Sequence, residues 1–531
     1  MSQLNVTTEG TTILGVPVGQ PGFVHNVTLK KLHQWSRRLL HRLASAEDLS
    51  RQAKMLILRQ CISFKPAFLA RTLHLNEPPG SRFSSDLFES RSSTALLFRF
   101  WDANVLSLVR YIAGGMKASD GVPTLSHLPI KLGGLGIRMQ GAQADMAFTA
   151  SLTAANYIYA RIQGHPTLLS RYTKQRIQHW WNAAETWGPA ITQEHLTVEQ
   201  SSYLVGVPHL DLDPPSISWQ RQLQTLLDGR FDPHFSSLEE LTRREFLQED
   251  VAAPTAWLTV LPSKQAFNIP DDEFATLLAA RLLHAPGHDL PVAAPCPLCH
   301  KPHMHSLSHI YKCRQLSQWC KLRHDRIVDI VAAFAPPHTQ IEAILQPVTR
   351  HSVVPPPPAA AIDVDDDDDD DTIDVANNTN SSLFDGNNNS YNINNFNNNI
   401  IKSHNGLRMD LVIPVPSKRA RIAVDVTVVA AQKKAPTTQR VFDLALSRKR
   451  QTYTRTLATS AISQLIAFSI NPFGSLSPDA CKFIDRLIPD PLIRADCRTR
   501  ISVSVARGTA RMIQCWSRRA YAFIANHQLD S

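Results

Sequence analysis

The hydrophobic positions of the first 185 residues recur at helical spacing. Ser45-x-x-Asp48 has the form of a capping box and predicts the start of a second helix, which Pro66 closes. Two more helices are predicted over 85–113 and 139–163. The first helix of the region is predicted from an apolar stripe at intervals of three to four residues, formed by Leu29, Leu32, Trp35, Leu39 and Leu43.

The turn before the last of these helices is rich in glycine. The segment Gly133-Gly-Leu-Gly136 lacks the spacing of a dinucleotide-binding fingerprint, and no clear strand precedes it. Because glycine adopts positive φ at little steric cost, the motif predicts a tight turn rather than a phosphate-binding loop.

The pattern changes after residue 406. β-rich runs predict one strand at Asp410–Pro414 and another at Ile422–Val429, joined by a basic turn. A helix of at least Val441–Tyr453 follows, and helical segments are predicted up to the C-terminus. With a helical connector at 186–290, the expected fold is multidomain α+β. Its N-terminal two-thirds are mainly helical, and its C-terminal part is a small α/β domain.

Residues 351–406 differ from the segments on either side. They hold a proline run, an asparagine-rich tract and an unbroken run of aspartate at Asp365–Asp371. Such a composition cannot bury enough apolar surface to offset the entropy lost on ordering, so we expect a disordered insert. For the aspartate run itself, a solvated linker is favoured over a metal-binding or histone-binding tail.

The insert masks the basic character of the rest of the chain. The formal net charge is +9, but without residues 351–405 there are 54 basic against 36 acidic residues, a net charge of +18. This surplus favours a polyanionic partner, nucleic acid first, over an inert basic surface. Because no apolar run of membrane-spanning length and no secretory signal are visible, we expect no membrane span. The expected location is nuclear or cytoplasmic, and not secreted.

One short stretch carries three of the eight cysteines together with a histidine. A closed shell of four such protein ligands is typical of structural rather than catalytic zinc. His309 is the preferred fourth ligand and His305 is the alternative. His300 and His303 lie too near the turn. The other cysteines are scattered, which favours a reducing compartment over a disulfide framework. The predicted zinc ligands follow one another as Cys296-x2-Cys299-x9-His309-x3-Cys313.

Two carboxylates mark the predicted strands of the C-terminal part. Asp410 begins the first strand and Asp425 lies inside the second, with 14 residues between them, which suits a hairpin. Lys449 and Tyr453 are four residues apart and therefore share one helix face. Metal-dependent nucleases hold Mg²⁺ with carboxylates on adjacent strands, and a lysine orients the attacking water. These four residues are therefore candidates for a catalytic site.

A plainer interpretation of the same residues stays open at this point. Asp425 would then point outward from a half-exposed strand, and Lys449 would belong to the solvated basic run Arg448–Arg450. A charge inside an apolar strand is costly to bury without a partner or a metal, so the environment of Asp425 decides between the two.

The order of these segments resembles the C-terminal half of a non-LTR retrotransposon reverse transcriptase that carries a restriction-like endonuclease. Ile13–Gly19 is similar to the turn after the polymerase palm, and the helices up to residue 113, with Leu128–Arg138, resemble the thumb. Ala256–Leu258 and Arg281-Leu282 resemble the linker before the zinc knuckle. The later matches are Arg323-His324 after the knuckle, Arg408-x-Asp410, Asp425, Lys449 and Tyr453 in the nuclease core, and the turn Asn471–Gly474.

The resemblance implies a role for each candidate residue. Asp410 and Asp425 would bind Mg²⁺, Lys449 would assist the nucleophile, and Tyr453 would support it. The Cys296, Cys299, His309 and Cys313 set would bind structural zinc. The implied partners are target DNA and element RNA, and the implied reaction is hydrolytic DNA nicking that leaves a 3′-hydroxyl for reverse transcription. The implied division is 1–185 thumb-like region, 186–290 connector, 291–335 zinc knuckle, 351–406 insert and 407–531 restriction-endonuclease-like domain.

Two features depart from that family. Met409 stands where the family usually has proline before the first aspartate, and no Tyr-x-Asp-Asp polymerase motif occurs. We therefore expect no polymerase activity from this chain alone, and a truncated element product or a partial gene model. Two alternatives remain: a catalytically inactive, nucleic-acid-binding remnant, and a protein-interaction scaffold without affinity for nucleic acid.

Overall fold

The structure is a computed structural model in which only part of the chain is described. The connector up to residue 254, the insert 351–406 and most of the helix predicted over 139–163 lie outside the described residues. The described residues are 9–73, 93–116, 121–141, a few positions between 143 and 162, 255–284, 295–301, 307–337, 339–345, 407–414, 421–430, 438–459 and 462–528.

A short hairpin and a helical bundle form the N-terminal part. The hairpin turns at Leu14 and Gly15, which both have positive φ (49° and 82°). The predicted apolar stripe is confirmed, because Leu32 and Leu43 are buried and its other members pack against the same core. The elements are β1 (Gly10–Ile13), β2 (Val16–Gly19), α1 (Pro21–Trp35), the π-helical η1 (Ser36–Leu40) and α2 (His41–Ser45).

The second helix begins at Ser50 rather than at the predicted capping box. The Ser50 hydroxyl accepts a hydrogen bond from the Ala53 amide at 3.2 Å, whereas Ser45 ends α2 and donates to the Arg42 carbonyl. The capping-box prediction was therefore wrong, because a second serine nearby meets the same need of the first turn. This part of the bundle contains α3 (Arg51–Ile57), η2 (Leu58–Ile62), α4 (Ala67–Thr72), α5 (Ser93–Ile112) and α6 (Gly121–His127).

The glycine-rich segment is the predicted tight turn. It follows the short helix η3 (Ile130–Leu132), and Gly133 and Gly136 both have positive φ (84° and 69°). The buried guanidinium of Arg281 holds this turn, since it donates to the Gly134 and Ile130 carbonyls at 3.1 and 2.9 Å. The glycines therefore serve packing between the bundle and the connector.

The C-terminal part is an α/β unit around a four-stranded sheet of order β3-β4-β5-β6. The first two pairings are antiparallel, and β5 and β6 are parallel because α17 crosses between them. Helices α16, α18 and α19 pack on one sheet face. The unit comprises α16 (Ser317–Ala333), β3 (Gln340–Leu345), β4 (Leu407–Pro414), β5 (Arg421–Val428), α17 (Thr438–Thr459), β6 (Ile462–Ile470), α18 (Pro478–Leu487) and α19 (Pro491–Gln528).

Two sequence predictions for this unit were wrong. The unit does not begin at residue 407, because α16 and β3 precede the insert and already belong to it. The segment 462–470, expected to be helical, is strand β6. Successive residues in the second half of β6 are all buried, so exposed and buried positions do not alternate there. A short apolar run of this kind has no period that distinguishes a strand from a helix. The coarse expectation of a mixed α+β protein is confirmed.

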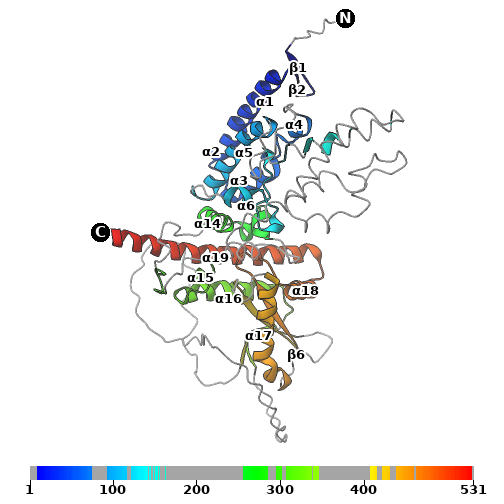
Figure 1. Ribbon diagram of the computed structural model, residues 1–531. Helices are drawn as coiled ribbons and strands as arrows, with labels where there is room; N and C mark the ends of the chain where they lie inside the picture. Colours follow the sequence, from blue (N-terminus) through cyan, green and yellow to red (C-terminus); the bar gives the residue numbers. More distant parts are fainter. Residues whose placement is uncertain are drawn as a thin grey trace, which may run out of the picture.

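Helix α19 crosses the molecule between the N-terminal bundle and the α/β unit (Figure 1). The carboxylate of Glu273 in α14 (Asp271–Arg281) pairs with Arg507 and Arg511 of α19 at 2.8 and 2.7 Å. In the bundle, the Gln52 amide donates to three carbonyls of the connector, and its oxygen accepts from the Ile269 amide. The connector around α13 (Ala256–Thr259) therefore bridges bundle and α19.

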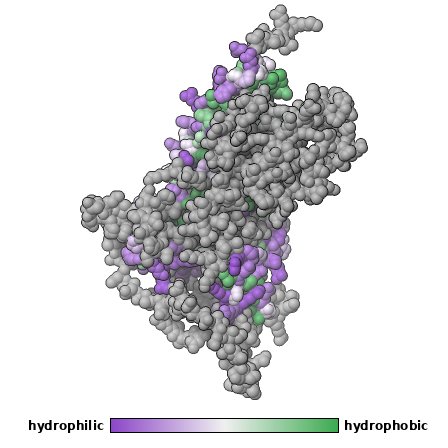
Figure 2. All heavy atoms as spheres, in the orientation of Figure 1, coloured by the Kyte–Doolittle hydropathy of each residue, from purple (hydrophilic) through white to green (hydrophobic). Residues whose placement is uncertain are grey.

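The described surface of the C-terminal part is largely hydrophilic in the view of Figure 2. Among the described residues, no helix is long and apolar enough to cross a membrane.

We predict that Glu273→Gln lowers the free energy of unfolding by about 2 kcal/mol, because the two arginines lose a buried counter-charge. Glu273 is 6% exposed, and the arginines are about a quarter exposed. The midpoint of urea unfolding measures the change.

Asp485→Asn is the matched control for this experiment. Asp485 also pairs with two arginines of α19, Arg494 and Arg498, but it is 42% exposed. Its loss should cost less than about 1 kcal/mol. Equal effects of the two substitutions would contradict the role given to burial.

Candidate metal centre and acidic site

The predicted cysteine and histidine ligands come together in one small module. The ligand atoms of Cys296, Cys299, His309 and Cys313 all lie within 4.8 Å of one another. Helix α15 (Leu307–Ile310) carries His309, and the Cys299 sulfur lies 3.4 Å from its Nε2. Three sulfurs and one imidazole nitrogen at this spacing fit a tetrahedral ion such as zinc.

The other histidines near the cysteines do not join the cluster in the described structure. His300 is exposed and adopts a left-handed conformation with φ of 56°. His303 and His305 lie outside the described residues. His309 is therefore the histidine that the described structure brings to the cluster.

Burial and backbone donors shift the pKa values of the thiols in this cluster. Burial and the neighbouring Cys296 and Cys299 raise the pKa of Cys313 to about 12. For Cys296, burial acts in the same direction, but amide donors from Cys299 and Leu298 outweigh it and hold its pKa below the usual value. Thiolates are the form that binds zinc, so amides aimed at a sulfur favour a metal site.

The metal module is anchored in the main core. The indole Nε1 of Trp516, in α19, donates to the Cys296 sulfur at 3.4 Å, and Cys296 is fully buried. Tyr311 packs edge-on against Phe473 with ring centroids 6.3 Å apart. The module is thus part of the core that joins α19 to the connector.

Asp410 and Asp425 face each other across neighbouring strands. The last paired residues of β4 and β5 are Leu411 and Val424, and the two aspartates occupy the next position in this register. Directly opposite side chains lie about 5 Å apart, so like charges there repel unless they are compensated. The two carboxyls are close enough to share a hydrogen bond.

Helix α17 compensates Asp425 from one sheet face. The Lys449 ammonium lies 3.1 and 2.9 Å from the two oxygens of Asp425, which is only 5% exposed. Burial nevertheless outweighs Lys449 and raises the pKa of Asp425. The Tyr453 hydroxyl also bonds to Asp425, and burial with that negative charge raises the pKa of Tyr453, so it stays a protonated donor. The outward-facing, solvated interpretation of Asp425 and Lys449 is wrong.

Helix α16 compensates Asp410 through His324. The His324 Nε2 lies 3.1 Å from Oδ2 of Asp410, and the Val426 amide donates to the same oxygen. Burial disfavours the charged form of both side chains, but their interaction with each other outweighs this effect. The pKa of Asp410 is held below, and that of His324 above, its usual range. Asp325 accepts from the other ring nitrogen at 3.1 Å and contributes to the second shift.

Sequence reasoning did not identify His324 as a site residue. It appeared only as part of the Arg323-His324 match, and no spacing relates it to Asp410, 86 positions further along the chain. The other four predicted residues of the acidic site, Asp410, Asp425, Lys449 and Tyr453, do come together. The site offers two carboxylates, whereas the cysteine and histidine set is the only group of three or more such ligands among the described residues.

Compared with family models and with curated proteins, the chain matches none of them. The resemblance to non-LTR retrotransposon reverse transcriptases therefore stays a prediction.

We predict that the purified chain carries about one zinc ion and that Cys313→Ser loses it, because three ligands hold a structural zinc much less tightly than four. Elemental analysis of the dialysed protein measures the change. Cys320→Ser is the control, since Cys320 lies nearby but outside the ligand set. Full zinc content in Cys313→Ser would show that the ligand assignment is wrong.

Proposed function

We propose that the α/β unit is a metal-dependent DNA endonuclease in a retrotransposon-derived, nucleic-acid-binding chain. The observation that carries this proposal is the buried Asp425 facing Asp410, with Lys449 bonded to it. Two opposed carboxylates with an adjacent lysine are costly for stability alone, and they are what metal-dependent phosphodiester hydrolysis needs.

The two carboxylates have the chemistry of a Mg²⁺ site. Mg²⁺ prefers oxygen ligands and is commonly held by one or two carboxylates, with water and substrate phosphate completing the shell. Asp410 and Asp425 supply those oxygens at one edge of the β4–β5 pairing. When bound, Mg²⁺ supplies Lewis acidity at the phosphate and favours ionisation of water.

The remaining residues hold and orient the groups that react. Lys449, paired with Asp425, would position the attacking water beside it, and the Tyr453 hydroxyl would fix the orientation of that carboxylate. His324 orients Asp410 from the opposite helix and keeps it ionised. The metal module and the basic surface of the chain would hold DNA or RNA, without taking part in the chemistry.

Met409 does not argue against this function. Its side chain is fully buried and packs with Val412, Ala423 and Tyr453. The residue before Asp410 thus serves the core on which Tyr453 rests. A methionine there is compatible with Asp410 lining the site.

The second candidate is a catalytically inactive, nucleic-acid-binding remnant. The observation in its favour is that both carboxylates already have basic partners, Lys449 and His324, with which a metal ion must compete. Both candidates predict that the chain binds nucleic acid, but only the endonuclease predicts that it cleaves DNA.

We predict that the zinc-loaded chain nicks supercoiled plasmid with Mg²⁺ or Mn²⁺, and that Asp425→Asn lowers the rate at least about 100-fold, because a lost metal ligand forfeits several kcal/mol of transition-state stabilisation. Gel analysis of nicked product over time measures the rate. Asp443→Asn, the same change at an exposed position of α17, should leave it unaltered.

The other outcomes separate the alternatives. Salt-dependent DNA binding without nicking would favour the inactive remnant, and no binding at all would favour a protein-interaction scaffold. Nicking that persists in Asp425→Asn would overturn the assignment of the acidic site.

A further inference from the structure

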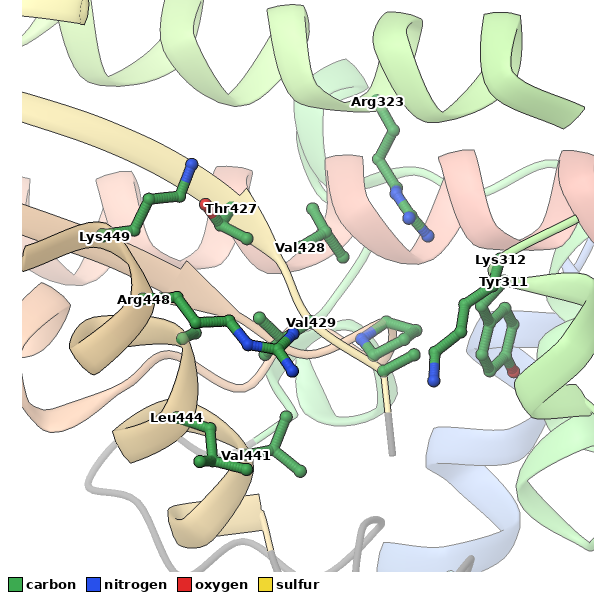
Figure 3. A pocket seen from close by; sticks show the side chains of 13 residues that line it. Tyr311, Lys312, Arg323, Thr427, Val428, Val429, Val441, Leu444, Arg448 and Lys449 are labelled. Carbon is green, nitrogen blue, oxygen red and sulfur yellow. The ribbon is translucent and has the colours of Figure 1, made fainter. Parts of the chain in front are cut away.

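A cavity of about 310 Å³ lies beside the acidic site, between the metal module and α17 (Figure 3). Lys449 lines it and also pairs with Asp425, so the cavity and the acidic site share a side chain. Its lining includes four cationic side chains and no carboxylate: Lys312, Arg323, Arg448 and Lys449. This charge distribution suits an anion.

Arg323 gives an independent indication of an anionic ligand. Its side chain is 3% exposed and points from α16 into this region (Figure 3). Nη1 donates to the Thr509 hydroxyl at 2.9 Å, while Nε has no hydrogen-bond partner among the described residues. No ion pair joins it to a described carboxylate. A buried guanidinium with this deficit is costly unless an anion completes its environment.

The stem of Arg323 is fixed by close packing. A Cβ at Gly508 of α19 would come within 2.8 Å of it, so glycine is needed for the arginine to pass. The guanidinium is therefore held in place before any ligand arrives, and preorganised charge binds without further loss of side-chain entropy.

Two further cations enter from opposite sides of the cavity. Lys312 comes from the metal module and Arg448 from α17, and Figure 3 shows both pointing into the space between them. Their positive charges act on each other. An anion between them would turn this repulsion into two attractive contacts.

Part of the cavity lining is apolar. It is formed by Val428 and Val429 at the end of β5, and by Val441 and Leu444 of α17, the helix that also carries Arg448. Such a lining suits the sugar attached to a phosphate, and the volume exceeds what a phosphate alone requires. A strand of nucleic acid offers both chemistries at every nucleotide.

We propose that this cavity binds one backbone phosphate, with its sugar, of a nucleic acid strand whose neighbouring phosphate lies at the acidic site. This proposal rests on the proposed function, since it names a substrate contact beside the same site. Arg448 and Lys312 contact the phosphate, and the buried guanidinium of Arg323 adds to the positive electrostatic potential inside the cavity.

The first experiment uses inorganic phosphate as the probe with the zinc-loaded full chain. Calorimetric titration should show saturable binding that weakens roughly tenfold in Arg448→Gln, because one charge-assisted contact is lost. Arg450→Gln is the matched control, with the same charge change two residues along α17, on another helix face. Equal binding by the original chain and Arg448→Gln would overturn the site.

The second experiment distinguishes a strand phosphate from a free one. A DNA duplex carrying one neutral methylphosphonate, moved position by position, is bound without Mg²⁺. The original chain should bind the duplex less tightly when the methylphosphonate is at one particular position, whereas the affinity of Arg448→Gln should not change at that position. The affinity of the variant should also depend less steeply on salt, by about one phosphate contact. Inorganic phosphate binding without any such position would assign the cavity to free phosphate and overturn the proposal.

These outcomes do not depend on cleavage. If the chain binds DNA with the predicted position but does not nick, the endonuclease proposal fails and the phosphate site stands. If it nicks but shows no position that depends on Arg448, the phosphate site fails and the endonuclease stands.

Discussion

Helix α19 imposes the constraint on which the other parts depend. Its indole Trp516 donates to a metal-site sulfur, its Thr509 accepts from Arg323, and its arginines share the buried carboxylate of Glu273. Each contact places a polar group where water is largely absent, so none can shift without leaving a donor or a charge unmet. The metal module, the connector and the α/β unit are therefore held in one arrangement, and the acidic site lies at a fixed place beside the module.

Charge in the α/β unit is arranged in two adjoining zones. The opposed carboxylates are neutralised by Lys449 and His324, which come from helices on different sheet faces. Directly beside them, the cavity is lined by four cationic side chains, Lys449 among them, and by no carboxylate. Such a division suits a ligand that brings both a divalent cation and negative phosphates, because each zone then meets its opposite charge.

How far the sequence predicted the site depends on the distance between its parts along the chain. The candidate metal ligands could be predicted because they span one short stretch in which ligand type and spacing carry the signal. Lys449 and Tyr453 could be placed on one face by helical periodicity. His324 could not, because its contact with Asp410 crosses the insert and is set by how α16 packs on the sheet. Strand β6 was missed because its tertiary burial removes the alternation of polar and apolar residues that marks a strand in the sequence.

By itself, the sequence determined the local features: helices where the apolar period is clear, the glycine turn, the cluster of candidate metal ligands and the two acidic strands. Only the tertiary structure decided that β3 joins the sheet from before the insert, that Asp425 is buried, and that Arg323 lines a cationic cavity. The physical reason is the range of the interactions. Turn geometry and periodicity act between near neighbours, whereas register, burial and charge compensation depend on segments that meet only when the chain has folded.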